Sequence, residues 1–77
     1  MKDTGSFSVI LFFSTNYAIR SKSIFEKNNL DHKVIPVPRH LSSDCGYTVR
    51  IEKKDELRAK ELLELNKVEY DRIAELE

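Results

Sequence analysis

The sequence has 77 residues, and its thirteen basic and thirteen acidic side chains give a formal net charge of zero. Such a balance removes the long-range field that steers proteins to nucleic acid or to an anionic membrane. No apolar run approaches the ~20 residues that span a bilayer, and the start of the chain lacks the features of a signal peptide. A single cysteine excludes an internal disulfide and fits a reducing cytoplasm. We therefore expect one cytoplasmic domain over residues 1–77, with residues 1–6 as a loose tail and no nucleic-acid or membrane partner.

The first half of the chain predicts a strand followed by a helix. Residues 7–13 are β-branched and aromatic, and they are apolar on both faces from Val9 onward, which is typical of a central strand. Ser14-Thr15-Asn16 then offers helix-capping side chains. An amphipathic apolar stripe continues to Asn28, and Asn28-Asn29 can end the helix because asparagine tolerates the left-handed C-terminal conformation.

The second half predicts a strand, a strand, a helix and a less certain last segment. Residues 32–37 indicate a strand that its proline places at a sheet edge. Residues 47–51 alternate apolar and polar and place three side chains on one face, namely Tyr47, Val49 and Ile51. Residues 54–66 favour a helix with four inward side chains: Ala59, Leu62, Leu63 and Leu65. Residues 68–74 suit a short edge strand or a continuing helix, and we favour the strand.

This order, βαββαβ, predicts an α+β ferredoxin-like fold, with a four-stranded antiparallel sheet and two helices on one face. In that arrangement the first and third strands lie in the middle. Four residues of the first strand can face the helices: Phe7, Val9, Leu11 and Phe13. Ile10 and Phe12 would then point to the open side and form an apolar surface, which predicts a homodimer through the open sheet face. The alternative is that the loop or the N-terminal tail covers these two side chains.

The loop over residues 36–46 concentrates the unusual residues, since it holds both prolines, one of the two glycines and the only cysteine. The prolines stiffen its start. Cys45 is the only strong nucleophile, and a free thiol is mostly protonated at neutral pH unless cations or backbone N–H groups stabilise the thiolate. Arg39 and His40 could fold back toward the sulfur, whereas the adjacent Asp44 disfavours the thiolate. The alternative is that Cys45 is a small buried hydrophobe.

The remaining polar residues do not form a recognised metal or catalytic pattern. His32, His40, Cys45 and Asp44 lack a recurrent ligand spacing, so we expect no metal and no cofactor. A thiol enzyme would need a second catalytic group held by another element, and none is evident, so we expect a protein that is not an enzyme. Residues 14–16 could bind an anion at the helix start, although simple capping is the more ordinary interpretation.

Three motifs point further: Phe13-Ser14-Thr15-x-x-Ala18, Ile35-Pro36-Val37-Pro38-Arg39 and Leu41-Ser42-Ser43-Asp44-Cys45-Gly46. Together they resemble the small bacterial "putative Se/S carrier protein-like" domain family, over residues 7 to 74. The resemblance implies a role in sulfur or selenium handling, with Cys45 as the family cysteine and Gly46 as the glycine after it. It also matches Arg39, Ser42 and Ser43 to the residues that lead to that cysteine, and Thr15 to the threonine after the first strand.

From these observations we expect a sulfur or selenium carrier in which Cys45 holds a persulfide or selenopersulfide for transfer to a partner protein. Arg39 would offset the charge, Ser42 and Ser43 would donate hydrogen bonds to the terminal atom, and Gly46 would leave room for the donor or acceptor protein. The alternative is a non-catalytic ferredoxin-like regulatory or interaction module in which the cysteine is structural.

Overall fold

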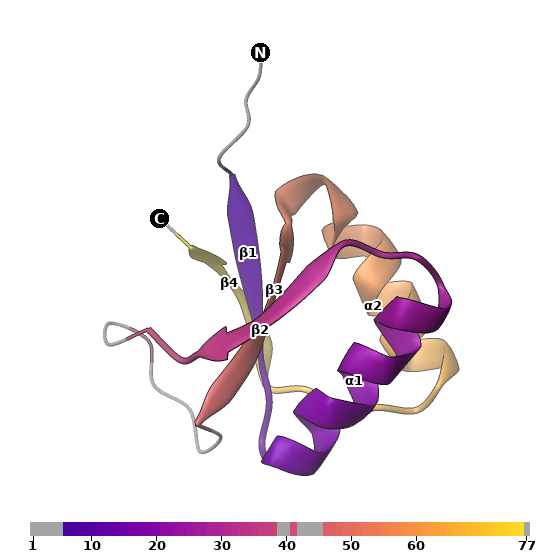
Figure 1. The fold of residues 1–77 in the computed structure, drawn as a ribbon, viewed down its shortest axis with the longest axis horizontal. Coiled ribbons are helices and arrows are strands. Elements are labelled where there is room, and N and C mark those ends of the chain that lie inside the picture. Colours follow the sequence, from indigo (N-terminus) through magenta and orange to yellow (C-terminus); the bar gives the residue numbers. More distant parts are fainter. Residues whose placement is uncertain (1–5, 39–40, 42–45, 77) are drawn as a thin grey trace.

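The structure, a computed structural model, describes residues 6–38, 41 and 46–76. Its elements are β1 (Phe7–Leu11), α1 (Thr15–Lys27), β2 (His32–Pro36), β3 (Tyr47–Glu52), the 3₁₀ turn η1 (Lys53–Asp55), α2 (Glu56–Leu65) and β4 (Arg72–Leu76) (Figure 1). The four strands form one antiparallel sheet in the order β2-β3-β1-β4. This architecture confirms the predicted α+β ferredoxin-like fold.

Strand β1 lies at the centre of the sheet, as its apolar sequence predicts. Ile10 pairs with Val49 of β3 on one side and with Ile73 of β4 on the other. Four of its five residues are buried. A strand with hydrogen-bonded neighbours on both edges and apolar side chains on both faces loses almost all contact with water, which favours this central position.

The two faces of β1 are exchanged relative to the prediction: the residues expected on the open side face the helices. Ile10 and Phe12 have no exposed surface and belong to the core formed with the helices. Successive side chains of a strand alternate between faces, so Val9 and Leu11 point away from the helices. Both of these are also fully buried. The argument for a homodimer through the open sheet face rested on an exposed Ile10 and Phe12, and that argument is wrong.

A polar contact explains why this face of β1 can be the inner one. Ser8 lies on the same face as Ile10 and is fully buried, yet its hydroxyl donates a hydrogen bond to Glu56 Oε2 at the start of α2. A buried hydroxyl with a partner avoids the cost of an unsatisfied polar group. No buried side-chain nitrogen or oxygen among the described residues lacks a hydrogen-bond partner.

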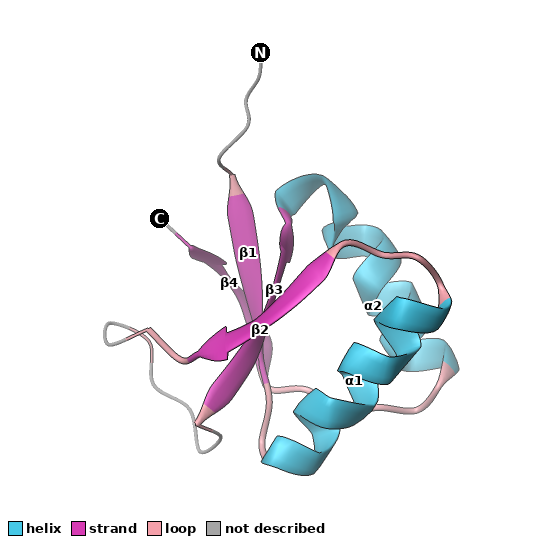
Figure 2. Cartoon of the chain, in the orientation of Figure 1, coloured by secondary structure: helices cyan, strands magenta, loops and turns pink. Residues whose placement is uncertain are grey.

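The two helices cover one face of the sheet and close a single core against it. Figure 2 shows them side by side, in cyan, on the same side of the magenta strands. Both contribute to one cluster of buried residues: Ile10, Phe12, Ala18, Phe25, Leu30, Val49, Ile51, Ala59, Leu63 and Val68. Helix α2 buries Ala59 and Leu63 as predicted and Leu62 in part, but the prediction for Leu65 is wrong, because this side chain is 79% exposed.

Both helices end with the same hydrogen-bonded motif. In α1 the amide of Leu30 donates to the carbonyl of Phe25 at 2.9 Å, and Asn29 has a left-handed φ of 58°. In α2 the amide of Val68 donates to the carbonyl of Leu63 at 2.9 Å, and Lys67 also has a φ of 58°. This is the Schellman arrangement, in which the residue after the left-handed one packs into the core. The predicted helix end at Asn28-Asn29 is thereby confirmed.

The same motif corrects the prediction for the last segment. Residues 68–74 were expected to form the edge strand, but Val68 is the buried residue that completes the end of α2. The edge strand exists and begins later, at Arg72. Its first contact with β1 is the hydrogen bond from the amide of Asp71 to the carbonyl of Leu11, at 2.7 Å.

Lys67 gives a test of the α2 terminus. A side chain with a Cβ is strained in the left-handed region, whereas glycine is not, although glycine loses more entropy on folding. We expect Lys67→Gly to raise the free energy of unfolding by about 0.5–1 kcal/mol. Urea denaturation measures the change. Lys67→Ala, which keeps the Cβ, is the control, and a glycine variant no more stable than the alanine variant would contradict the assignment.

The ion pair between Lys53 Nζ and Glu75 Oε2 connects η1 to β4 and gives a test with pH. The hydrogen bond and charge of Lys53 hold the pKa of Glu75 below its ordinary value of 4.5. A carboxyl whose pKa is lowered by folding stabilises the folded state above that ordinary value, and the stabilisation is lost as the pH falls through the lowered pKa.

We therefore expect Glu75→Gln to lower Tm slightly at pH 7 and to have a progressively smaller effect below pH 4.5. The effect should also shrink in high salt, because both groups are exposed. Glu69→Gln, a change at an exposed carboxylate for which the described residues provide no ion pair, should leave Tm unchanged. A deficit that stays constant from neutral pH to the acid limit would rule out the ion pair as its cause.

Candidate functional site

The strand pair β2–β3 positions the base of the loop that carries the cysteine. Pro36 is the last residue of β2 and stands opposite Tyr47, the first residue of β3. One residue further, the amide of Val37 donates to the carbonyl of Gly46 at 3.1 Å, so the pairing extends beyond the ladder. The amide of Leu41 donates to the carbonyl of Pro38 at 3.0 Å. The two ends of the loop are therefore held together at Val37 and Gly46.

The predicted site residues fall into two groups. Cys45, Arg39, Ser42 and Ser43 lie outside the described residues, as do His40 and Asp44, which the sequence also singled out. Gly46 and Thr15 lie inside them, and both are exposed. A Cβ built on Gly46 would meet no heavy atom within 4 Å, so the space beside this residue is open. The structure thus describes Gly46, the residue after the cysteine, and shows that this glycine is accessible.

Thr15 and the end of the cysteine loop meet at one groove, although they are far apart in the sequence. Thr15 is the first residue of α1. The groove has a volume of about 290 Å³, and we call it the α1–β3 groove; its lining residues are Thr15, Ala18, Ile19, Lys22, Val34 and Tyr47. Tyr47 directly follows Gly46. The residue that matches the family threonine therefore lies beside the strand that follows the family cysteine.

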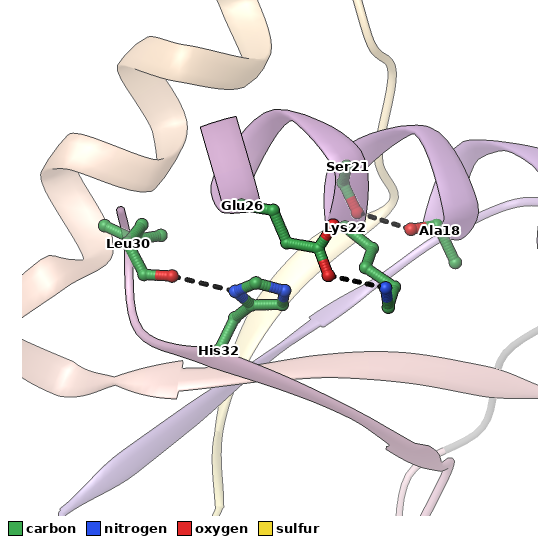
Figure 3. A network of polar contacts seen from close by, with 6 residues as sticks. All are labelled: Ala18, Ser21, Lys22, Glu26, Leu30 and His32. Atoms are coloured by element: carbon green, nitrogen blue, oxygen red, sulfur yellow. Dashed lines mark hydrogen bonds and ion pairs between the residues drawn. The ribbon is translucent and has the colours of Figure 1, made fainter. Parts of the chain in front are cut away.

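The wall of the α1–β3 groove is apolar even at its charged residue. Lys22 contributes its aliphatic stem, because its Nζ is bound to Glu26 Oε2 at 2.7 Å, one helical turn further along α1 (Figure 3). The hydrogen bond and the charge of Lys22 lower the pKa of Glu26. Ser21, on the buried side of α1, donates its hydroxyl hydrogen bond to the carbonyl of Ala18 at 2.8 Å. The groove therefore offers an apolar recess next to the loop rather than a charged one.

Sequence reasoning did not find this groove. One signal was available: Ile19 lies outside the apolar stripe of α1, and it is 59% exposed. Tyr47 was expected on the same face as Val49 and Ile51, but it is half exposed at the end of its strand whereas the other two are buried. Tyr47 is the first residue of the inner strand β3 and lies beside the start of α1 at the end of the sheet, a position that depends on tertiary packing.

The start of α1 follows the predicted position without the predicted side-chain bond. Ser14 occupies the N-cap position with extended backbone angles, φ −152° and ψ 161°, but its hydroxyl makes no capping hydrogen bond. The amide of Ala18 donates to the carbonyl of Ser14 at 3.4 Å. Helix α1 is thus stabilised mainly by its packing on the sheet.

The side chain of His32 is held by contacts within the fold. Its Nδ1 donates to the carbonyl of Leu30 at 2.8 Å, and its ring lies edge-on against Phe25 with centroids 5.8 Å apart (Figure 3). The ring is partly buried. Across residues 6–38, 41 and 46–76, no three histidine, cysteine, aspartate or glutamate side chains gather as metal ligands. Within the same residues, no helix has the length and apolar character needed to cross a membrane.

The fold and the loop define a class: a ferredoxin-like domain whose β2–β3 connection carries a single cysteine. Comparison with known families gives the assignment. The chain belongs to the family described as "Putative Se/S carrier protein-like", whose family model matches residues 7–75. No curated protein and no solved structure matches the chain. Family membership thereby confirms the resemblance inferred from the three sequence motifs.

Gly46 gives a test of the open space at the base of the loop. Because an added Cβ would meet nothing within 4 Å, we expect Gly46→Ala to change the free energy of unfolding by less than about 0.5 kcal/mol. Ile51→Ala, a change in the core, should in contrast destabilise by about 2–5 kcal/mol. Urea denaturation of both variants measures the difference, and a strongly destabilised Gly46→Ala protein would show that this glycine serves the fold.

Proposed function

We propose that this protein is a non-enzymatic carrier of sulfur or selenium, and that Cys45 is the atom-carrying residue. The observation that carries the proposal is membership of the Se/S carrier-like family over residues 7–75. The structure adds support at the base of the loop: Val37 and Gly46 hold its two ends together, and the space beside Gly46 is open. A carrier needs a thiol in a defined place that another protein can approach.

The proposed transfer is a thiol–persulfide exchange. The Cys45 thiolate attacks the terminal sulfur of a persulfide on a donor protein, and a new S–S bond forms between Cys45 Sγ and that sulfur. The bond between this sulfur and the donor cysteine breaks, and the donor leaves as a thiolate, so no external oxidant or reductant is consumed. The same exchange with a terminal selenium atom gives a selenopersulfide. A second exchange passes the atom to an acceptor protein.

The other loop residues have supporting roles in this proposal. Arg39 offsets the negative charge of the persulfide, and Ser42 and Ser43 donate hydrogen bonds to its terminal atom, as charge-assisted bonds stabilise an anion. Thr15 lies at the α1–β3 groove beside Tyr47, which supports a role near the loop. Gly46 admits the partner. None of these roles requires a metal or an organic cofactor, and a compartment that keeps Cys45 reduced, such as the cytoplasm, suits the chemistry.

Loading with sulfur tests the proposal directly. After incubation with a cysteine desulfurase and free cysteine, we expect mass spectrometry to show one added sulfur atom on the Cys45 peptide, and none on a Cys45→Ser protein. An unrelated sulfur carrier loaded in parallel controls for desulfurase activity. The Gly46→Ala protein should react normally with a small aromatic disulfide but load more slowly, since only the protein donor needs the open space. Absence of sulfur on Cys45 while the control carrier is loaded would refute the carrier function.

The alternative, an interaction module with a structural cysteine, is favoured by one specific observation, the apolar α1–β3 groove. It makes the opposite prediction for the thiol. In an interaction module Cys45 packs in the protein and reacts with the aromatic disulfide only after unfolding, whereas in a carrier it reacts in the native state.

A further inference from the structure

The α1–β3 groove is close to the cysteine along the chain. Tyr47 lines the groove, and only Gly46 separates it from Cys45 in the sequence. Two residues span at most about 7 Å even when fully extended, so this wall of the groove is near the thiol whatever the conformation of the loop. A molecule that occupies the groove therefore lies beside the thiol.

The proposed sulfur transfer brings a donor protein to the same place. The donor sulfur and Cys45 Sγ must approach to about 2 Å as the new S–S bond forms. A transient protein contact buries roughly 600 Å² on each partner, which corresponds to a patch with a radius of about 14 Å. Tyr47 lies well inside that radius. A donor protein centred on the thiol therefore covers Tyr47 as well.

The exposure of the groove favours a protein segment over a free small molecule. Ligand pockets bury about 70–90% of the surface of a small ligand. Here four of the six lining residues are exposed: Thr15, Ile19, Lys22 and Tyr47. A small apolar molecule in the groove would stay partly in water, whereas a protein segment would cover the groove and its exposed rim together.

The lining of the groove sets the chemistry of the side chain that fills it. Ile19 and Val34 are aliphatic, and Tyr47 contributes an aromatic ring. The one charged lining residue, Lys22, is bound to Glu26 at 2.7 Å. A charged side chain that entered the groove would lose its hydration without gaining a partner, which is costly. The segment must therefore present an aliphatic or aromatic side chain to the groove.

Gly46 gives an independent observation at the same place. A chain needs glycine where φ is positive, or where neighbouring atoms leave no room for a Cβ. Neither reason applies to Gly46, because its φ lies outside the left-handed region and an added Cβ would meet no heavy atom within 4 Å. The fold itself therefore does not explain a glycine between the thiol and Tyr47. A residue without a side chain lets the backbone of another molecule come close.

We propose that the α1–β3 groove is the docking site for the donor protein, and that it receives an apolar side chain of the donor segment that carries the persulfide. This side chain binds between Ile19 and Tyr47, while the backbone of the segment passes over Gly46 and brings the donor sulfur to Cys45. The inference rests on the proposed carrier function. It adds that the donor is recognised by apolar contact with α1 and β3, outside the cysteine loop itself.

Two sources of sulfur separate docking from the reactivity of the thiol. A persulfidated cysteine desulfurase must dock, whereas inorganic polysulfide loads the thiol by the same exchange, releases a shorter polysulfide and needs no docking. We expect Ile19→Glu to raise the concentration of this protein that gives half-maximal loading by the desulfurase at least about tenfold, because it places a charge in the apolar groove. Tyr47→Ser, which removes the ring on the other side, should act in the same way. Ile19→Leu should restore loading, and polysulfide should load all of these proteins at one rate.

Leu57→Glu is the matched control. It introduces the same charge at an apolar residue of similar exposure, 69% against 59% for Ile19, but on α2, which does not line the groove. This variant should load from the desulfurase like the unmodified protein. Binding without transfer gives a second measurement: the Cys45→Ser protein should bind the desulfurase in a calorimetric titration, and adding Ile19→Glu should weaken this binding at least about tenfold. Circular dichroism verifies that each protein is folded.

The outcomes distinguish a failure of the docking site from a failure of the carrier function. If the unmodified protein acquires sulfur from neither source, or from polysulfide alone, the carrier function fails and the docking site with it. If the unmodified protein and Ile19→Glu load equally well from the desulfurase, only the docking site is refuted. An equal loss with polysulfide would also refute it, because the substitution would then disturb the thiol itself. So would a dimer of the unmodified protein that Ile19→Glu dissociates, because a second copy would then fill the groove.

Discussion

The burial of β1 on both faces is the constraint on which the rest of the structure depends. The strand pairs with β3 and β4, and its inner face receives both helices. If the register of β1 shifted by one residue, Ile10 and Phe12 would leave the core, and Ser8 would turn to the opposite face of the sheet. The hydrogen bond from Ser8 to Glu56 therefore matters beyond its own energy, because it satisfies the one polar group that this orientation buries.

The position of the candidate site follows from that central strand. Because β1 holds β3 in place, β3 can pair with β2 on its other edge, and the end of this pairing closes the loop at Val37 and Gly46. Strand β1 also leads directly into α1, which begins at Thr15 beside the same end of the sheet. Two segments distant in the sequence thus meet at the α1–β3 groove because both extend from strands of one antiparallel core.

The sequence predicted the features that local chemistry decides. The apolar run of β1 required a central place, Pro36 required an edge strand, and Asn29 suited a left-handed helix end. It could not predict which face of β1 turns inward, since both faces are apolar and hydrophobicity does not distinguish them. For the site, the motifs identified the cysteine loop and Thr15, but the groove that joins Thr15 to Tyr47 depends on how α1 packs against the sheet.

The errors among the apolar residues share a physical cause. Leu65 follows Leu62 by three residues and so can be counted with the stripe of α2, but it is only two residues from the buried Leu63, and this spacing turns its side chain to water. Tyr47 likewise continues the inner face of β3 past the point where the helices cover it. An apolar residue placed just beyond the edge of a core costs solubility without stabilising the fold, and contact with another protein surface recovers that burial. The exposure of Leu65 and Tyr47 thus follows from where the core ends, which the spacing of apolar residues along the chain does not define.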